Sequence, residues 1–211
     1  MVKGLDEGTE QHILDAAYRV IIQKGKQGAR MQEIADEAGV NKALLHYYFR
    51  SKDKLYEAVL SNVLGTVLKT VASNIDFSLP FKDLLSSFVR NHIAVIRENG
   101  NIVRFFFSEI WTNKEELVPM LRTYLQTADG SLPKLFRARV KKAIKDKEIR
   151  KVDPFHLLMN IISLDVFFHI AGPVFFMMMN VPDLIQKKLE NDRANQVVEF
   201  IWAALEYRGA E

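Results

Sequence analysis

Residues 34–52 read IADEAGVNKALLHYYFRSK, and this stretch decides the fold. Small and apolar side chains recur at helical spacing in two short blocks, at about Met31–Ala38 and Lys42–Phe49. Gly39 stands between them, where a chain leaving a helix commonly adopts the left-handed conformation that glycine tolerates best. Asn41 can cap the helix that follows. The pattern therefore predicts two short helices that cross steeply around a tight turn, which is the helix-turn-helix geometry.

The second short helix has, on its outer side, the side chains that suit an approach to the major groove of DNA. Lys42 can bind a phosphate or a guanine, and Ala43 allows the backbone to come close and can contact a thymine methyl group. His46 and Tyr47 offer hydrogen bonds to a base or a phosphate. These residue types favour a nucleic-acid contact over a purely structural helix hairpin, which is the alternative for this pattern.

Positive charge is concentrated next to this motif. The whole chain has a net charge of only +3, but residues 42–54 contain Lys42, Arg50, Lys52 and Lys54 against the single acid Asp53. Lys52 also lies at the start of the next helix, where free backbone N–H groups attract a phosphate. We therefore expect Lys52 to contact the DNA backbone.

The rest of the chain has helical periodicity as well. A first helix is expected at about Glu10–Lys24, with Thr9 as its N-cap and Gly25 at its end. Ser51 is expected to cap a fourth helix. Further helices are expected at about 80–98, 102–111, 114–127, 132–145 and 153–171 and after Pro182. The helix at 153–171 is expected to have Asp153 as its N-cap and proline at its first position. Because no strand pattern is found, the predicted fold is all-α, with about nine to ten helices.

The run Ile34–Lys52, together with Ile13–Ala17 and the pair Leu55-Tyr56, resembles the signature of TetR-family repressors. The resemblance implies a three-helix helix-turn-helix DNA-binding domain at residues 1–52 and a larger helical domain for ligand binding and dimerisation at residues 53–211. Carried over by position, it implies that the recognition helix contacts DNA through Lys42, Ala43, Leu44, His46 and Tyr47, and that Lys52 contacts a phosphate.

Three positions depart from the family pattern. Arg30 stands where the family often has a threonine that caps the second helix, and it can bind a phosphate instead. Leu44 replaces a small polar residue, and His46 replaces a tyrosine. We interpret His46 as a neutral hydrogen-bonding substitute, and the alternative is that it makes DNA binding sensitive to pH.

Large apolar side chains gather in the second half of the chain. Consecutive aromatic residues such as Phe105–Phe107 cannot all face one core, so some of them are expected to line a cavity or an interface. A ligand pocket needs such a lining and a few polar groups, for which Glu109 and Asp165 are further possibilities. The alternative for each aromatic residue is plain core packing. The candidate ligand-binding residues are His92, Phe106, Trp111, Phe168, His169 and Phe176.

No metal and no cofactor are expected. Soft thioether ligands prefer Cu(I), but the side chains of Met177–Met179 would point in different directions on a helix. Asp165 and His169 lie one turn apart without a third ligand, so we expect them to form a hydrogen-bonded pair.

The last helix has an apolar stripe at 197/198, 201/202 and 205. With the helix that starts at Asp153 it can form a four-helix bundle across a two-fold axis, and the resemblance likewise implies a homodimer through the C-terminal helices. The apolar segment Phe155–Met179 contains Asp165 and His169, which a lipid-facing span tolerates poorly. We interpret it as a buried helix and expect no membrane partner.

The sequence thus predicts a dimeric repressor that a small apolar or aromatic ligand releases from a palindromic operator in double-stranded DNA. The alternative is a helical adaptor that binds a protein partner and does not depend on Lys42 or Lys52. An enzyme is not expected, because nucleophile elbows, phosphate loops and HExxH motifs are missing from the sequence. The lack of cysteine and of an apolar signal region at the N-terminus predicts a cytoplasmic location.

Overall fold

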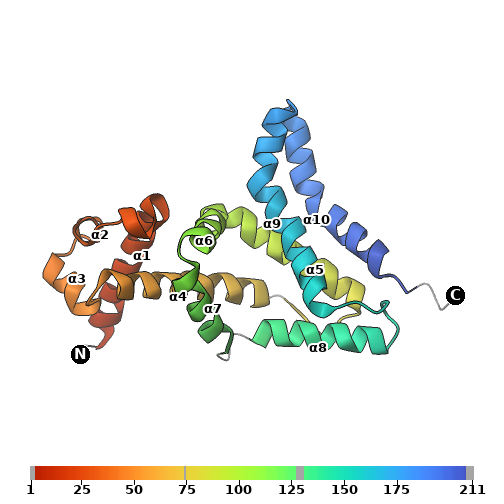
Figure 1. Ribbon diagram of the computed structural model, residues 1–211, viewed down its shortest axis with the longest axis horizontal. Helices are drawn as coiled ribbons and strands as arrows, with labels where there is room; N and C mark the ends of the chain where they lie inside the picture. The colour runs from red at the N-terminus through yellow and green to blue at the C-terminus, as the bar shows by residue number, and fades with distance from the viewer. Residues whose placement is uncertain (1–2, 74, 127–130, 208–211) are drawn as a thin grey trace. The chain divides into compact units, whose positions relative to one another are not determined.

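The computed structural model describes residues 3–73, 75–126 and 131–207. Within these ranges the regular structure is helical, apart from one isolated β-bridge between Ile149 and Glu206, so the all-α prediction is confirmed. Ten helices are described (Figure 1), in agreement with the expected number: α1 Lys3–Gly28, α2 Met31–Glu37, α3 Lys42–Tyr48, α4 Lys52–Ser73, α5 Phe81–Glu98, α6 Gly100–Thr112, α7 Lys114–Gln126, α8 Ser131–Lys145, α9 Pro154–Met178 and α10 Asp183–Leu205.

The chain divides into two compact units. The first unit comprises residues 1–66 and 104–124, and the second comprises residues 67–103 and 125–211. This division does not coincide with the boundary after residue 52 that the resemblance implied, because the start of α4 is part of the first core: Leu55 and Tyr56 are buried there, and the Tyr56 hydroxyl donates to Glu109. The helices α4, α6 and α7 each have residues in both units.

The first unit begins with a longer helix than the sequence pattern predicted. α1 starts at Lys3, so Thr9 lies inside it and is not its N-cap. Gly25 does interrupt the helical conformation, with φ of 68° and ψ of 171°, and a last short turn continues to Gly28. The turn after α2 agrees with prediction: Gly39 has φ of 60°, and the side chain of Asn41 accepts a hydrogen bond from the Leu44 N–H at 2.8 Å.

The second unit is built on α5, α8, α9 and α10. α5 lies against the other three helices, and its buried side chains Leu84, Phe88 and Val89 belong to a core shared with Phe136 of α8 and Val197 of α10. The first backbone N–H of α5 donates to Glu148 Oε2 at 2.7 Å, and Arg139 pairs with the same carboxylate at 2.9 Å. The Arg139 guanidinium holds the pKa of Glu148 below its usual value.

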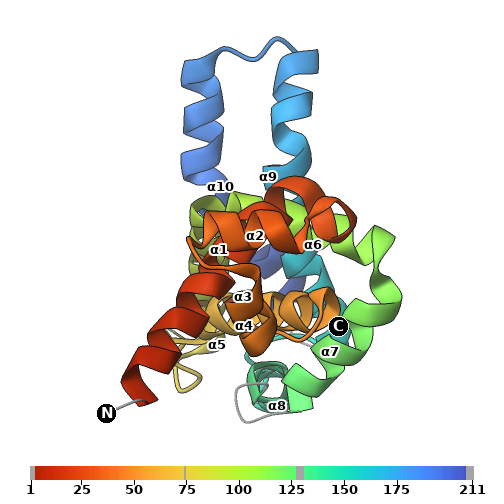
Figure 2. The same ribbon diagram turned by 90° about the vertical axis from the view of Figure 1, so that its left-hand side faces the viewer.

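The helices α9 and α10 form an antiparallel pair joined by the turn at residues 179–182 (Figures 1 and 2). Asp153 caps α9 by accepting from the His156 N–H at 2.9 Å, as predicted. The predicted end near Ala171 is wrong, because α9 continues through Pro173 to Met178. Proline removes one backbone donor from a helix, yet α9 continues beyond it, and Phe176 near its end is buried and contacts Phe168 of the same helix.

The interpretation of α9 as a buried helix is also wrong for a single chain. Among the described residues, α9 is the one helix long and apolar enough to cross a membrane, and only 28% of its most apolar window is buried. The buried Asp165 lies in the middle of the helix, where a lipid-facing span accommodates a carboxylate poorly. α9 therefore packs through one side and leaves an apolar side uncovered.

The positive φ of Gly39 gives a test of the turn. Gly39→Ala is expected to lower the free energy of unfolding by about 1 kcal/mol, because a Cβ in the left-handed region costs roughly 1–2 kcal/mol. No heavy atom lies within 4 Å of the added methyl, so packing does not contribute. Gly8→Ala, at an exposed position inside α1, is the matched control and is expected to raise stability by about 0.5–1 kcal/mol. Urea denaturation measures both, and a stabilising Gly39→Ala would contradict the proposed role of the turn.

Candidate nucleic-acid interface

The outward side of α3 is formed by Lys42, Ala43, His46 and Tyr47, which we call the α3 edge. All four side chains are exposed, whereas Leu45 on the opposite side is fully buried. The course of α1, α2 and α3 can be followed in Figure 2. The helix is thus held in the fold by one side and presents the other to solvent.

Tyr47 is the most prominent part of this edge. Its side chain is 73% exposed, and its ring makes an edge-on contact with Tyr48 at a centroid distance of 5.4 Å. A large, exposed aromatic side chain with a polar tip contributes little to the core, but it is well suited to a contact with another molecule. The remaining member of the predicted set on this helix, Leu44, is half-buried.

The basic residues of the segment 13–54 fall into two groups. Arg19, Lys24, Lys26 and Lys54 each form an ion pair with an acidic side chain. Within the same described segment, Arg30, Lys42, Arg50 and Lys52 have no acidic partner within 4.0 Å. The positive charges that remain uncompensated are therefore the ones around α3, including three predicted to contact DNA.

The two flanking cations differ in how they are held. Arg30 is exposed at the N-cap position of α2 and makes no side-chain capping bond, as its residue type predicted. The Lys52 ammonium donates to the backbone oxygen of Gln27 at 3.2 Å. Ser51 accepts from the Lys54 N–H at 3.2 Å and caps α4. Lys52 is thereby oriented at the start of a long helix, and its remaining N–H donors are available to an anion.

The candidate ligand-binding residues fall into both units. Phe106 and Trp111 belong to the first unit, where Trp111 is 84% exposed and Phe106 is half-buried. His92, Phe168, His169 and Phe176 belong to the second unit. The structure brings Phe168 and Phe176 together in an edge-on contact at 5.8 Å.

The polar groups of the second unit pair differently from the expectation. His92 Nδ1 lies 2.7 Å from Asp165 Oδ2, whereas His169 Nδ1 lies 2.7 Å from the backbone oxygen of Asp165 and not from its carboxylate. Sequence reasoning missed Arg193, whose guanidinium lies 4.5 Å from the centre of the Phe168 ring. Sequence periodicity held no signal for this contact, because it does not say which helices become neighbours.

Comparison with known proteins decides the family. Residues 13–59 match the sequence model of the bacterial regulatory proteins of the tetR family, a range that contains α2, α3 and the start of α4. The HTH-type transcriptional regulator RutR of Escherichia coli O157:H7 is 32% identical over 148 residues, which cover 69% of this chain and 66% of RutR. The chain belongs to the TetR family. It is accordingly a DNA-binding transcriptional regulator, and the adaptor alternative is not favoured.

Solved structures of two regulators share the fold. FadR of Bacillus subtilis, in complex with stearoyl-CoA, superposes with a TM-score of 0.64 at 19% identity and covers 89% of this chain and 97% of its own. The flavonoid-responsive regulator FrrA superposes with a TM-score of 0.63 at 18% identity and covers 96% of this chain and 100% of its own. At this level of identity the likeness concerns the fold alone.

A charge-neutralising substitution on the α3 edge tests this TetR-type interface. Lys42→Ala is expected to reduce the slope of log affinity against log salt concentration by about one per subunit, because each phosphate contact releases about one counterion. Fluorescence anisotropy with a 30-base-pair duplex of random sequence measures the slope. Lys24→Ala, whose ammonium already pairs with Glu33, is the matched control and is expected to leave the slope unchanged. Equal slopes for the wild type and Lys42→Ala would exclude a phosphate contact by Lys42.

Proposed function

We propose that this chain is a transcriptional repressor that binds a palindromic operator as a homodimer and releases it when a small apolar or aromatic effector binds the second unit. The observation that carries the proposal is the α3 edge, where exposed Lys42 and Tyr47 are combined with uncompensated positive charge. Arg30, Leu44, His46 and Lys52 remain predicted DNA contacts. A cytoplasmic location goes with this function, since the operator is chromosomal.

The proposed dimer uses the uncovered side of α9 and α10. Large apolar side chains on this side are exposed at helical intervals, and we call them the α9–α10 face: Phe155, Met159 and Val174 of α9, and Ile185, Leu189 and Phe200 of α10. An exposed apolar patch of this kind marks an interaction site. In a two-fold dimer the same face of both copies is covered at once, because the interface is self-complementary.

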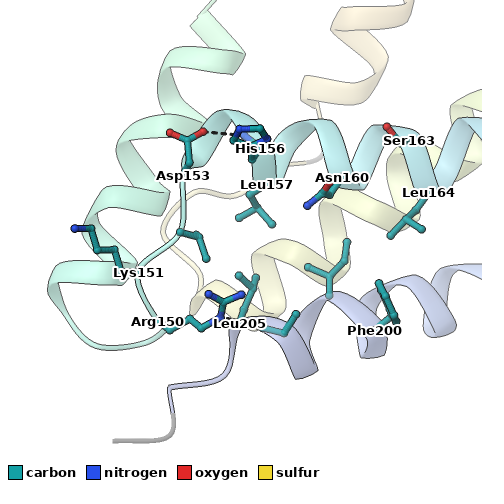
Figure 3. Close-up of a pocket in the computed structure, with 13 residues that line it drawn as sticks. Arg150, Lys151, Asp153, His156, Leu157, Asn160, Ser163, Leu164, Phe200 and Leu205 are labelled. Atoms are coloured by element: carbon teal, nitrogen blue, oxygen red, sulfur yellow. Dashed lines mark hydrogen bonds between the residues drawn. The ribbon is translucent and has the colours of Figure 1, made fainter. Parts of the chain in front are cut away.

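An open groove lies between the two helices on the same face (Figure 3). It has a volume of about 620 Å³, with Asp153, His156 and Asn160 of α9 on one side and Phe200 and Leu205 of α10 on the other. Phe200 stands at the groove and is 68% exposed. We propose that side chains of the second copy fill this groove, since apolar side chains from facing helices interdigitate in four-helix bundles.

Release requires that the effector prefers a state in which the two recognition helices no longer match the operator. The expected coupling free energy is about 1–3 kcal/mol, which corresponds to a roughly 5–150-fold loss of operator affinity. Among the relatives in fold, FadR was solved with stearoyl-CoA, which has a long apolar acyl chain, and FrrA is a flavonoid-responsive regulator. They support an effector of this general character for the present chain.

Selection of binding sites from random duplex DNA tests the operator proposal. The enriched sequences are expected to contain two inverted half-sites whose centres lie about one helical turn, roughly 10 base pairs, or a multiple of it apart. A variant with both Lys42→Ala and Tyr47→Ala is expected to lose the enrichment while keeping its helical circular dichroism. Enrichment of a single unrepeated motif by the wild type would rule out the palindromic operator.

Substitution within the α9–α10 face tests the dimer. Phe200→Glu places a charge where a second copy is proposed to pack, so light scattering after gel filtration is expected to show a monomer where the wild type is a dimer. Leu135→Glu replaces another exposed apolar residue of the second unit, on α8, and is the matched control that should remain dimeric. A dimeric Phe200→Glu variant, or a monomeric wild type at micromolar concentration, would contradict the proposed interface.

A further inference from the structure

A buried polar cluster lies where α5, α9 and α10 meet in the second unit. Its centre is Asp165, whose side chain is completely buried. One carboxylate oxygen, Oδ2, lies 2.7 Å from His92 Nδ1, while Oδ1 has no hydrogen-bond partner among the described residues. Burial raises the pKa of Asp165, and the neighbouring His92, Arg193 and His169 oppose this rise. A buried carboxylate oxygen without a partner is costly, so it marks a position where a further group is expected.

His169 contributes a second unsatisfied atom. Its Nδ1 lies 2.7 Å from the backbone oxygen of Asp165, and a carbonyl oxygen can only accept, so Nδ1 carries the hydrogen. In the neutral ring the other nitrogen, Nε2, is then an acceptor. This atom is buried and also lacks a partner in the described part of the chain. The cluster thus has two buried acceptors without donors.

Arg193 adds an unsatisfied donor. One terminal N–H donates to the backbone oxygen of Leu164 at 2.7 Å, and the guanidinium stacks over the Phe168 ring. Its Nε is buried without an acceptor in the described residues, and burial lowers the pKa of Arg193 whereas Asp165 opposes this effect. Leu164 and Phe168 connect this polar group to an apolar groove of about 450 Å³, which is lined by Leu164, Phe167, Phe168, Phe175, Phe176 and Arg193.

We propose that this cluster and the adjoining groove bind the effector of the proposed repressor, and that the effector is an aromatic compound with at least two hydroxyl groups. The ligand site itself is argued from the structure, and only the description of the ligand as an effector rests on the proposed function. The groove would hold the apolar body of the compound, and its volume suits one or two rings. Of the three residues Arg193 lines the groove, whereas Asp165 and His169 do not, so the hydroxyl groups would extend past Arg193 into the cluster. There they would donate to Asp165 Oδ1 and His169 Nε2, and a hydroxyl oxygen would accept from Arg193 Nε.

Other polar groups fit this cluster less well. A carboxylate has no donor for the two free acceptors and would place a second negative charge near Asp165. An ammonium group has donors, but it offers no acceptor to Arg193 and adds a positive charge beside it. A hydroxyl group both donates and accepts, so it is the group that can satisfy all three atoms. A phenylalanine side chain from a second copy would leave all three unsatisfied, which distinguishes this groove from the one that Phe200 borders.

Calorimetric titration of the full-length protein with three matched probes tests whether the site prefers hydroxyl groups. Hexylresorcinol has two phenolic hydroxyl groups on an apolar body. Its dimethyl ether has a similar shape without hydrogen-bond donors. The third probe, hexylbenzoate, is the anion of hexyl-substituted benzoic acid and carries a carboxylate instead of the hydroxyl groups. Hexylresorcinol is expected to bind at least roughly tenfold more tightly than either of the other two, because two buried hydrogen bonds distinguish it. Tighter binding of the ether or of hexylbenzoate, or no binding of hexylresorcinol, would overturn the proposal.

Two substitutions locate the probe. His169→Phe keeps a ring of similar size and removes the Nε2 acceptor, so it is expected to weaken binding of hexylresorcinol roughly tenfold. His12→Phe changes an exposed histidine of α1, in the first unit, and is expected to leave the affinity unchanged. Equal affinity of His169→Phe and the wild type would place the compound elsewhere and overturn the assignment, provided that both proteins show the same thermal unfolding without the probe.

Two separate measurements distinguish failure of the proposed ligand site from failure of the proposed repressor function. Calorimetry reports binding without DNA, whereas operator release is measured by anisotropy with and without hexylresorcinol. Binding that depends on His169 but leaves operator affinity unchanged would confirm the site and contradict its role as an effector site. Release that needs no more hexylresorcinol in His169→Phe than in the wild type would contradict the proposed site and leave the repressor intact.

Discussion

The buried ammonium of Lys26 is the constraint on which the first unit depends. The side chain is only 7% exposed, pairs with Asp53 at 3.0 Å and with Glu116, and lies 4.9 Å above the Tyr56 ring. Burial alone would lower the pKa of Lys26, but the bonds to Glu116 and Asp53 outweigh this effect and raise it. Beside it, Tyr56 donates to the buried Glu109, which also accepts from Asn113 at 2.6 Å. Asp53 and Glu116 are themselves 71% and 53% exposed, so water screens both pairs. The buried ammonium between them still joins α1 to α4 and α7, and the bond from Tyr56 to Glu109 adds α6.

In the proposed mechanism, this network links the α3 edge to events elsewhere in the chain. The helices that contribute Tyr56 and Glu109, α4 and α6, each continue into the second unit. A helix is a stiff element, so a rotation or shift at one end is carried along its length. In the proposed mechanism an effector bound near Asp165 acts on the second unit, and the two helices transmit the change to the end of α1 at Lys26. The DNA-binding helices are thereby biased without any direct contact with the effector.

The sequence predicted what local chemistry determines. The turn at Gly39, the cap at Asn41 and the exposed side of α3 follow from residue types within a few positions of one another, and the structure agrees with each. The long course of α9 was missed because proline usually ends a helix, whereas this helix continues through Pro173 to Met178. The pairing of His92 with Asp165 and the position of Arg193 were beyond reach, because they depend on which helices become neighbours. The exposure of α9 could not be predicted for the same reason. Hydropathy measures how apolar a segment is, but it does not say which other helices cover that segment.

If the α9–α10 face forms the proposed dimer, it ties the stability of this regulator to its abundance. Whatever binds the native state and not the unfolded chain shifts the folding equilibrium by mass action, and a second copy does so in proportion to concentration. With the proposed dimer, a cell that contains few molecules holds more of them as single subunits, which are less stable and carry only one recognition helix. Synthesis and degradation of the protein would then set two quantities together, the fraction of chains that survive proteolysis and the occupancy of the operator.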